Sequence, residues 1–211
     1  MKLQIALDDV TLEQALALLE QVGDDVDIVE VGTPFMMEYG MEPVRRIKER
    51  FPGLEVLCDT KIMDAGAYEA RLAFEAGADY VTVLGVTDDR TIQEVAAEAA
   101  RNSGKVMADM ICVPDLPERI ARLEELGVDV IAVHTGVDQQ AAGRTPLDDL
   151  REMRAHVKHT AIAVAGGIRL ETLDQYLLYR PEILIVGGGI AHAKDPARAA
   201  KELAERIHEA G

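Results

Sequence analysis

Phe74-Glu-Ala-Gly-Ala-Asp79 runs directly into the apolar stretch Tyr80–Leu84, and Leu123-Glu-Glu-Leu-Gly-Val-Asp129 runs into Val130–Val133 in the same way. Each segment places a glycine at the point where a helix should stop, because glycine readily adopts the conformation that ends one. The run that follows is apolar at nearly every position, as expected for a strand buried on both faces of a parallel sheet. Both segments therefore predict a helix that ends just before a buried strand.

The same alternation extends along the whole chain. Longer segments with helical spacing of apolar residues, such as Leu12, Ala15, Leu16 and Leu19, separate eight short apolar runs. The predicted strands are Lys2–Leu7, Asp27–Val31, Glu55–Cys58, Tyr80–Leu84, Lys105–Met110, Val130–Val133, Ala161–Ala165 and Ile183–Val186. Eight βα units without a linker predict an α/β fold, a (β/α)8 TIM barrel, as a single compact domain over residues 1–211.

An open, doubly wound sheet is the alternative architecture for alternating strands and helices. Its dinucleotide-binding form carries a Gly-x-Gly-x-x-Gly fingerprint in the first βα turn. That turn here reads Leu7-Asp8-Asp9-Val10-Thr11 and has no glycine. The sequence therefore favours the closed barrel.

Composition and charge narrow the functional classes. With 48% hydrophobic and 28% charged residues, the chain is typical of a folded globular protein. A net charge of −16 argues against nucleic-acid binding, which requires clustered Lys and Arg. No apolar stretch has the length of a membrane span or a signal peptide, so no membrane association is expected. Cys58 and Cys112 lie in apolar runs and are interpreted as reduced thiols, which indicates the cytoplasm.

Polar residues stand at the carboxyl ends of several predicted strands, where the active site of a TIM barrel lies. Four strands place carboxylates there and a fifth adds an imidazole. These residues are Asp8, Glu30, Asp59 with Lys61 and Asp64, Asp109, and His134. Because so many ionisable groups converge on one rim, we interpret the rim as a catalytic site.

The strongest local signal is Cys58-Asp-Thr-Lys-Ile-Met-Asp-Ala-Gly66. Strand alternation places Asp59 and Lys61 on the same side, and Asp64 begins the following loop or helix. Neighbouring carboxylates keep Lys61 charged, so that it can stabilise an oxyanion as negative charge develops. The alternative is a structural ion pair with Asp64 as a helix N-cap.

Glu30 is a carboxylate in an otherwise apolar strand, where a charged group needs a partner. A divalent cation shared by Glu30 and Asp59 would provide one, and Mg²⁺ usually takes only one or two protein carboxylates. A salt bridge to Lys61 is the alternative partner. No Cys/His cluster suggests zinc.

His134 and two glycine-rich turns complete the predicted site. At the end of its strand His134 can exchange protons near neutral pH. The last two strands end in Ala165-Gly-Gly-Ile168 and Val186-Gly-Gly-Gly-Ile190. Gly166, Gly167, Gly187 and Gly188 allow backbone N–H groups to approach an anion, so we expect the substrate's phosphate there. Two tight turns without a ligand are the alternative.

The whole chain resembles the orotidine 5′-monophosphate decarboxylase superfamily and, within it, the 3-hexulose-6-phosphate synthases. The resemblance is carried by many sequence blocks in register. They are Leu7-Asp8, Val26-Asp-Ile-Val-Glu-Val-Gly-Thr33, Asp59-Thr-Lys-Ile-Met-Asp-Ala-Gly66, Phe74-Glu-Ala-Gly-Ala-Asp79, Val133-His-Thr-Gly136, Gln140-Ala-Ala-Gly143, Ala163-Val-Ala-Gly-Gly-Ile168 and Val186-Gly-Gly-Gly-Ile190.

Differences at a few positions distinguish the synthases from a related branch of the superfamily. The 3-keto-L-gulonate-6-phosphate decarboxylases share Glu30, the Asp/Lys/Asp array and His134, but typically carry arginines where this chain has Val137 and Gly188. At the position of Asp109 the decarboxylases have a Glu, whereas the synthases have an Asp, as this chain does. These differences favour the synthases. Orotidine monophosphate decarboxylase itself has no use for a metal-binding Glu30.

The resemblance implies a reaction and a division of labour. A synthase joins formaldehyde to D-ribulose 5-phosphate, giving D-arabino-hex-3-ulose 6-phosphate through a Mg²⁺-stabilised 1,2-enediolate, and the reaction is reversible. By resemblance, Glu30 and Asp59 would bind Mg²⁺, with Mn²⁺ also possible, and His134 would remove the C1 proton while Lys61 stabilises the enediolate. Asp8 and Asp109 would contact the substrate. The family's dimers further imply a homodimer in which Asp64 reaches the partner's site.

Three other functions compete with this one. The decarboxylase uses the same enediolate for a different reaction. A non-catalytic barrel that binds sugar phosphates would keep the glycines without needing the carboxylates. Ribulose-phosphate 3-epimerase acts on the same substrate class, but its metal site uses histidines at strand ends, where only His134 occurs here.

Overall fold

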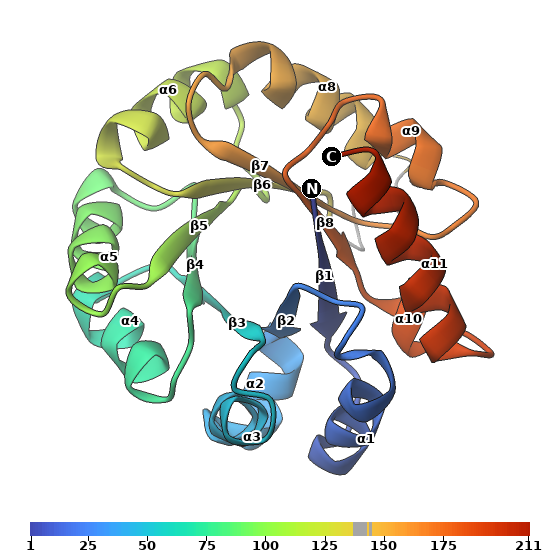
Figure 1. Cartoon of the computed structure of the whole chain (residues 1–211). Coiled ribbons are helices and arrows are strands. Elements are labelled where there is room, and N and C mark those ends of the chain that lie inside the picture. The colour runs from blue at the N-terminus through green and yellow to red at the C-terminus, as the bar shows by residue number, and fades with distance from the viewer. Residues whose placement is uncertain (137–142, 144) are drawn as a thin grey trace.

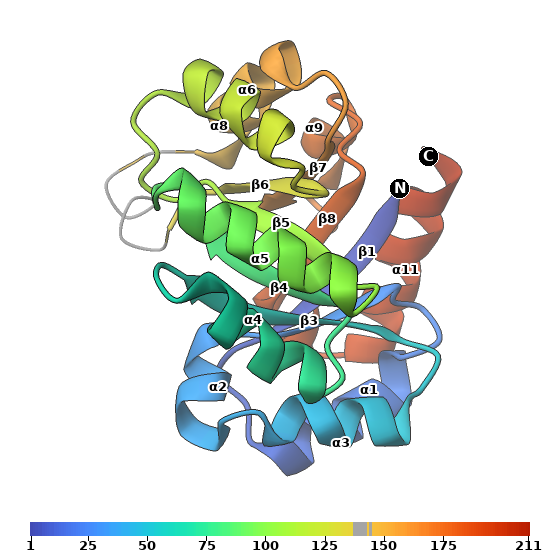
Figure 2. The ribbon, with the colours of Figure 1, turned by 90° about the vertical axis from the view of Figure 1, so that its left-hand side faces the viewer.

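The computed structural model describes residues 1–136, 143 and 145–211. Eight strands form a closed barrel in which each strand pairs in parallel with the next, and β8 pairs with β1. The helices surround the barrel on the outside (Figure 1), and the side view in Figure 2 shows the N- and C-termini close together. The predicted (β/α)8 TIM barrel is confirmed.

The strands follow the predicted apolar runs closely. The largest difference is at the third strand, which continues four residues beyond its predicted end at Cys58. The strands are β1 (Lys2–Leu7), β2 (Ile28–Val31), β3 (Glu55–Ile62), β4 (Tyr80–Leu84), β5 (Lys105–Asp109), β6 (Val130–His134), β7 (Ala161–Ala165) and β8 (Ile183–Val186).

The helices begin and end at residues suited to those positions. Thr11 forms a capping box with Gln14, and Gly127, a predicted helix end, adopts the left-handed conformation. The helices are α1 (Leu12–Val22), α2 (Thr33–Tyr39), α3 (Glu42–Arg50), α4 (Gly66–Glu75), α5 (Asp89–Arg101), α6 (Leu116–Leu126), α8 (Pro146–His156), α9 (Leu173–Leu177), α10 (Gly188–Ala191) and α11 (Pro196–Glu209).

Two apolar clusters hold the barrel together, one on each face of the sheet. The larger cluster lies between the strands and the surrounding helices and includes Phe35, Ile92 and Leu203. The smaller cluster includes Leu57 and Met107 and fills the barrel interior. Because both strand faces are covered, the strands read as nearly unbroken apolar runs in the sequence.

An irregularity in β3 shapes the mouth of the barrel. From Cys58 to Ile62 the chain advances four residues, whereas the paired stretch of β4, Val81 to Val83, advances two. The extra residues include Lys61, whose φ of 46° lies in the left-handed region that non-glycine residues seldom adopt. Asp59 and Lys61 nevertheless lie on the same side, as predicted, because both line the cavity at the barrel mouth and form an ion pair.

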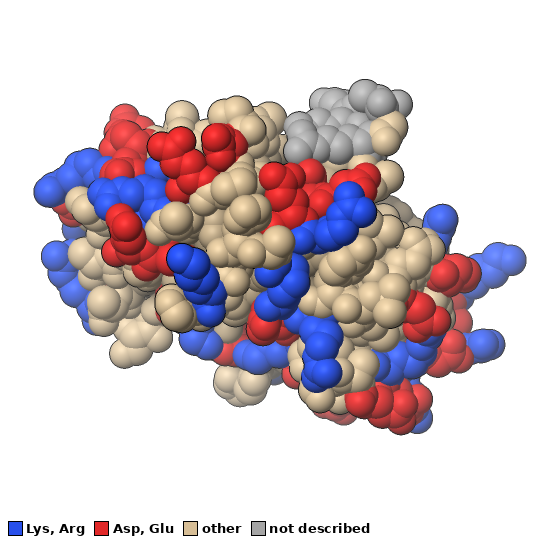
Figure 3. Space-filling view, turned by 90° about the horizontal axis from the view of Figure 1, so that it is seen from above, with Lys and Arg blue, Asp and Glu red and all other residues tan. Residues whose placement is uncertain are grey.

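The surface carries charges of both signs. On the face shown in Figure 3, basic and acidic side chains are intermingled rather than separated into patches. Within the described part of the chain, none of the helices has the length and hydropathy to cross a membrane. Of the two cysteines, Cys58 is buried as expected, whereas Cys112 is exposed because it lies in the loop after β5.

Candidate functional site

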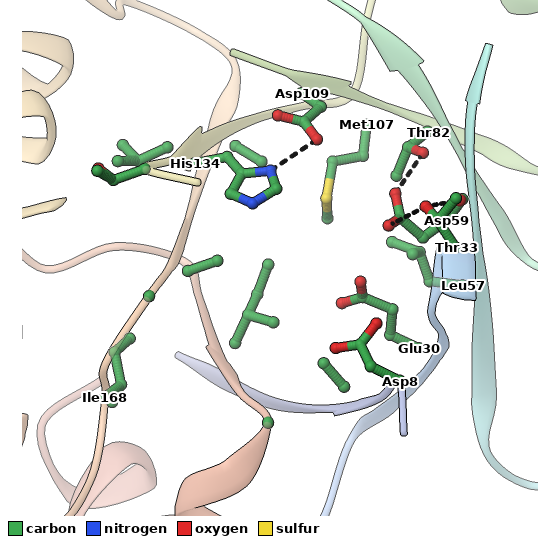
Figure 4. A pocket seen from close by; sticks show the side chains of 18 of the residues that line it. Asp8, Glu30, Thr33, Leu57, Asp59, Thr82, Met107, Asp109, His134 and Ile168 are labelled. Carbon is green, nitrogen blue, oxygen red and sulfur yellow. Dashed lines mark hydrogen bonds and ion pairs between the residues drawn. The ribbon is translucent and has the colours of Figure 1, made fainter. Parts of the chain in front are cut away.

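A cavity of about 800 Å³ opens at the carboxyl ends of the strands. Nearly all the side chains predicted for the site line it, and Figure 4 shows Asp8, Glu30 and Asp59 on one side with Asp109 and His134 opposite. The predicted residues that line the cavity are Asp8, Glu30, Asp59, Lys61, Asp109, His134, Gly166, Gly167, Gly187 and Gly188.

Asp59 is the most firmly held carboxylate in the cavity. Only 5% of the residue is exposed, yet both carboxylate oxygens accept hydrogen bonds. Thr82 Oγ1 donates to Oδ1 at 2.8 Å, and Thr33 Oγ1 donates to Oδ2 at 2.8 Å. Thr82 also accepts a hydrogen bond from the backbone N–H of Lys61 at 2.8 Å, so one hydroxyl positions both functional residues. A buried carboxylate needs such partners to remain charged.

Lys61 lies between two carboxylates. Its ammonium forms an ion pair with Asp59 and lies 3.4 Å from Asp109 Oδ2. Burial acts to lower the pKa of Lys61, but the charges of Asp59 and Asp109 outweigh it and raise the pKa above its ordinary value. Lys61 therefore stays charged in the cavity, which is the state needed to stabilise an oxyanion.

Asp109 joins Lys61 to His134. His134 Nδ1 lies 2.8 Å from Asp109 Oδ2, and the backbone N–H of Ile111 donates to Oδ1 at 2.9 Å. Burial acts to raise the pKa of Asp109, but the hydrogen bond with His134 and the charges of His134 and Lys61 lower it. An ionised Asp109 orients the imidazole and leaves its Nε2 facing the cavity in Figure 4. This geometry suits proton transfer to or from a bound molecule.

Glu30 has an unusual environment for a carboxylate. Its Oε2 accepts a hydrogen bond from Gln4 Nε2 at 2.6 Å, rather than forming the alternative salt bridge with Lys61. Burial, reinforced by the charge of Asp59, raises the pKa of Glu30 to about 8. The same two causes raise the pKa of Asp8. This side of the cavity therefore concentrates carboxyl groups that lack a cationic partner of their own.

These carboxyl groups fit a metal that uses few protein ligands. Among the described residues, no three His, Cys, Asp or Glu side chains form a cluster that could hold a metal ion. Mg²⁺ needs only one or two carboxylates and completes its coordination with water and substrate oxygens. Glu30 and Asp59 lie close enough for the charge of Asp59 to raise the pKa of Glu30, so the pair suits such an ion.

Glycines form the wall of the cavity after β7 and β8. Gly166 and Gly167 have φ angles of 114° and 68°, which L-residues with side chains rarely adopt. Gly187 and Gly188 line the cavity beside them. The sequence predicted both turns, and the structure brings them to the same wall.

Asp64 differs from the other predicted residues. It is exposed, lies outside the cavity lining, and accepts a hydrogen bond from the N–H of Ala65 at 2.7 Å. Ala65, not Asp64, is the N-cap of α4, so the alternative role of Asp64 as a helix cap is wrong. Its expected role in a partner's site stays a prediction. Val137, one of the positions that separated synthase from decarboxylase, lies outside the described residues.

Sequence patterns did not reveal several polar residues in or beside the cavity, among them Gln4, Thr33, Thr82 and Arg169. Gln4 lies in the middle of a strand and is fully buried. A polar residue in an otherwise apolar strand is a usable signal, as it is for Glu30, because a buried polar group needs a partner. Thr33 and Thr82 gave no such signal, since threonine is common in strands.

Comparison with known proteins places this site in a family. A model of the orotidine 5′-phosphate decarboxylase / HUMPS family matches residues 1–203. The chain belongs to this family. It is 46% identical over 207 residues to the 3-hexulose-6-phosphate synthase of Bacillus subtilis, covering 98% of this chain and 99% of that protein.

Solved structures agree with this assignment. A crystal structure of 3-hexulose-6-phosphate synthase from Salmonella typhimurium superposes with a TM-score of 0.97 at 52% identity, covering all of both chains. The 3-keto-L-gulonate-6-phosphate decarboxylase from Vibrio cholerae gives a TM-score of 0.82 at 29% identity, covering 98% of each chain. The resemblance to the synthases is therefore confirmed, and the decarboxylase is a more distant neighbour.

The raised pKa of Glu30 predicts a specific dependence of stability on pH. The folded protein holds the Glu30 proton up to about pH 8, whereas the unfolded chain loses it near 4.5. Without metal, Glu30 should therefore lower the free energy of unfolding as pH rises through this window. Urea unfolding of the wild-type protein and of Glu30→Gln, both in chelator, isolates this contribution. A wild-type-minus-variant difference that does not change between about pH 5 and 8 would contradict the assignment.

Proposed function

We propose that the chain joins formaldehyde to D-ribulose 5-phosphate, forming D-arabino-hex-3-ulose 6-phosphate, as a 3-hexulose-6-phosphate synthase. One observation carries this proposal: the connected row Asp59–Lys61–Asp109–His134 lines the same cavity as Glu30 and Asp8. It combines a charged ammonium, an oriented imidazole and a pair of carboxylates suited to a metal. A barrel that only binds sugar phosphates would have no need for these groups.

Glu30 and Asp59 are the residues proposed to hold Mg²⁺, with Mn²⁺ as the other candidate. When bound, such an ion acts as a Lewis acid that polarises the ketone and neighbouring hydroxyl of the sugar phosphate. Asp59 is fixed for this role by the hydroxyl groups of Thr33 and Thr82. Glu30 must first release its proton, because a ligating carboxylate is deprotonated.

In this proposal His134 transfers the proton and Lys61 stabilises the negative charge. His134 Nε2 removes a proton from C1 of the sugar phosphate, and Asp109 stabilises the resulting imidazolium. Lys61 stabilises the negative charge of the enediolate. C1 of the enediolate then attacks the carbon of formaldehyde, and the oxygen of formaldehyde receives the proton held by His134. The reaction requires no oxidant or reductant.

The remaining cavity residues are proposed to bind the sugar phosphate. The turns at Gly166–Gly167 and Gly187–Gly188 leave space for the phosphate against the backbone, because side chains are absent there. Asp8 and Asp109 line the same cavity and are suited to hydrogen-bond the substrate's hydroxyl groups. This places the phosphate and the reacting carbon at opposite sides of one cavity.

The reaction itself is testable with purified protein. With Mg²⁺, D-ribulose 5-phosphate and formaldehyde, we expect formaldehyde to be consumed and a six-carbon ketose phosphate to accumulate, as measured by colorimetric assay and NMR. The matched comparison offers 3-keto-L-gulonate 6-phosphate and measures carbon dioxide release. Decarboxylation without formaldehyde consumption would instead establish the decarboxylase, the competing function that uses the same residues.

The metal assignment predicts the behaviour of Asp59→Ala. This variant should lose Mg²⁺-dependent turnover by about 100-fold or more, because one of two carboxylate ligands is removed. Calorimetric titration should also show weaker Mg²⁺ binding, while circular dichroism checks that the barrel remains folded. Asp24→Ala is the matched control, since Asp24 is a carboxylate on the opposite end of the barrel at the turn before β2. Mg²⁺ binding by Asp59→Ala equal to that of the control would refute the assignment.

We further propose a homodimer in which Asp64 completes the partner's site. Met63, next to Asp64 in the sequence, is exposed, and so are large apolar side chains of α2, α4 and the loop after β4. Exposed apolar patches on folded proteins often mark an interface. The side chains concerned are Met37, Met63, Tyr68, Leu72 and Val86.

Mixing two inactive variants tests the dimer. Asp64→Ala damages only the partner's site, whereas His134→Ala damages its own. In a symmetric dimer a reassembled equal mixture should therefore regain about a quarter of wild-type turnover, because half of the dimers are hybrids with one intact site. The mixture should be denatured and refolded together, and sedimentation should report the dimer. If the mixture is no more active than its components, Asp64 does not act across subunits.

A further inference from the structure

Arg169 occupies a distinctive position in the cavity. It follows Gly166, Gly167 and Ile168 in the loop after β7, and it lines the same cavity as the catalytic groups. Among the described residues of this lining, Lys61 and Arg169 are the side chains that are cationic at every physiological pH. They differ in location, because Lys61 lies in β3 and Arg169 follows β7.

Lys61 and Arg169 differ in how tightly their charges are paired with carboxylates. Lys61 is held between Asp59 and Asp109. Arg169 forms an ion pair with Glu171, at 3.8 Å between Nε and Oε2, and both side chains are largely exposed, at 67% and 76%. Exposed pairs of this kind contribute little stability, so the guanidinium can exchange Glu171 for a ligand at small cost.

The backbone places Arg169 where the two glycine turns meet. A Cβ built on Gly189 would lie 2.6 Å from the carbonyl oxygen of Ile168 and 3.5 Å from Cβ of Arg169. The turn after β8 therefore packs directly against the stem of Arg169. An anion resting on the glycine wall would lie within reach of its guanidinium.

The charge of the cavity creates a need for such a cation. Four carboxyl groups, Asp8, Glu30, Asp59 and Asp109, line it in a chain of net charge −16. A sugar phosphate brings close to two further negative charges at neutral pH. The glycine wall supplies backbone dipoles but no formal charge, and Lys61 is already paired. A guanidinium fits a phosphate group in two-point contact.

We propose that Arg169 is a substrate-binding residue that pairs with the phosphate of the sugar phosphate and sets the enzyme's preference for phosphorylated over unphosphorylated sugars. This inference rests on the proposed function for the identity of the sugar. It adds a charged contact to the glycine wall, in the loop after β7. Glu171 competes with the phosphate for the same guanidinium.

The test separates the phosphate contact from the chemistry. Arg169→Ala should raise the KM for D-ribulose 5-phosphate by roughly tenfold or more while changing kcat by about twofold or less, because the contact is remote from the reacting carbon. With unphosphorylated D-ribulose as substrate, wild type and variant should have the same kcat/KM. Arg169→Lys should retain part of the effect, since it keeps the charge but loses the two-point contact.

Arg90→Ala is the matched control for net charge. Arg90 is exposed on α5, pairs with Glu94 and lies outside the cavity lining. Its loss changes the net charge by the same amount, so it should leave the KM for D-ribulose 5-phosphate close to the wild-type value. An equal rise in KM in both variants would show a long-range effect of charge and overturn the proposal.

Equilibrium binding distinguishes failure of this proposal from failure of the proposed function. Inorganic phosphate should bind wild type in a calorimetric titration, and Arg169→Ala should bind it at least roughly tenfold more weakly. If wild type does not turn over D-ribulose 5-phosphate with formaldehyde, the proposed function fails. The phosphate titration still tests whether Arg169 binds phosphate. Equal phosphate binding by wild type and variant would overturn the role of Arg169, whatever the reaction.

Discussion

The buried carboxylate of Asp59 is the constraint on which the site depends. A charge with only 5% exposure is tolerable because Thr33, Thr82 and Lys61 all contact it. These residues come from three neighbouring parts of the barrel, so satisfying Asp59 also fixes their relative positions. Lys61 then extends the contact to Asp109, and Asp109 to His134. One buried charge thereby organises the mouth of the barrel from β2 to β6.

Closure of the barrel brings these residues together, and the irregular strand β3 adjusts them. Two additional residues between Cys58 and Ile62 let Lys61 adopt a left-handed backbone conformation without breaking pairing with β4. Local strain of this kind persists where surrounding contacts enforce it, and it is common at functional sites. Here the hydrogen bond between the Lys61 N–H and Thr82 is one such contact.

The cavity divides into regions of different electrostatic character. Glu30 and Asp8 have raised pKa values because they are buried near Asp59, which leaves this side in need of positive charge. The central row is already balanced by Lys61. The glycine wall after β7 and β8 is open to an anion, with Arg169 at its edge. A molecule that presents oxygen ligands for a cation at one end and a phosphate at the other matches this distribution, which is the chemistry of a sugar phosphate.

The barrel and the rim residues were predictable from the amino-acid sequence, because buried strands show continuous apolar runs and helix ends show glycines. The sequence also predicted that Asp59, Lys61, Asp109 and His134 share one face, since the carboxyl ends of all strands meet there. The contacts that these side chains make became known from the three-dimensional structure. Glu30 pairs with Gln4 rather than Lys61, Asp64 faces outward, and Arg169 stands at the glycine wall. These outcomes depend on side-chain directions and on packing between strands distant in sequence, which periodicity does not encode.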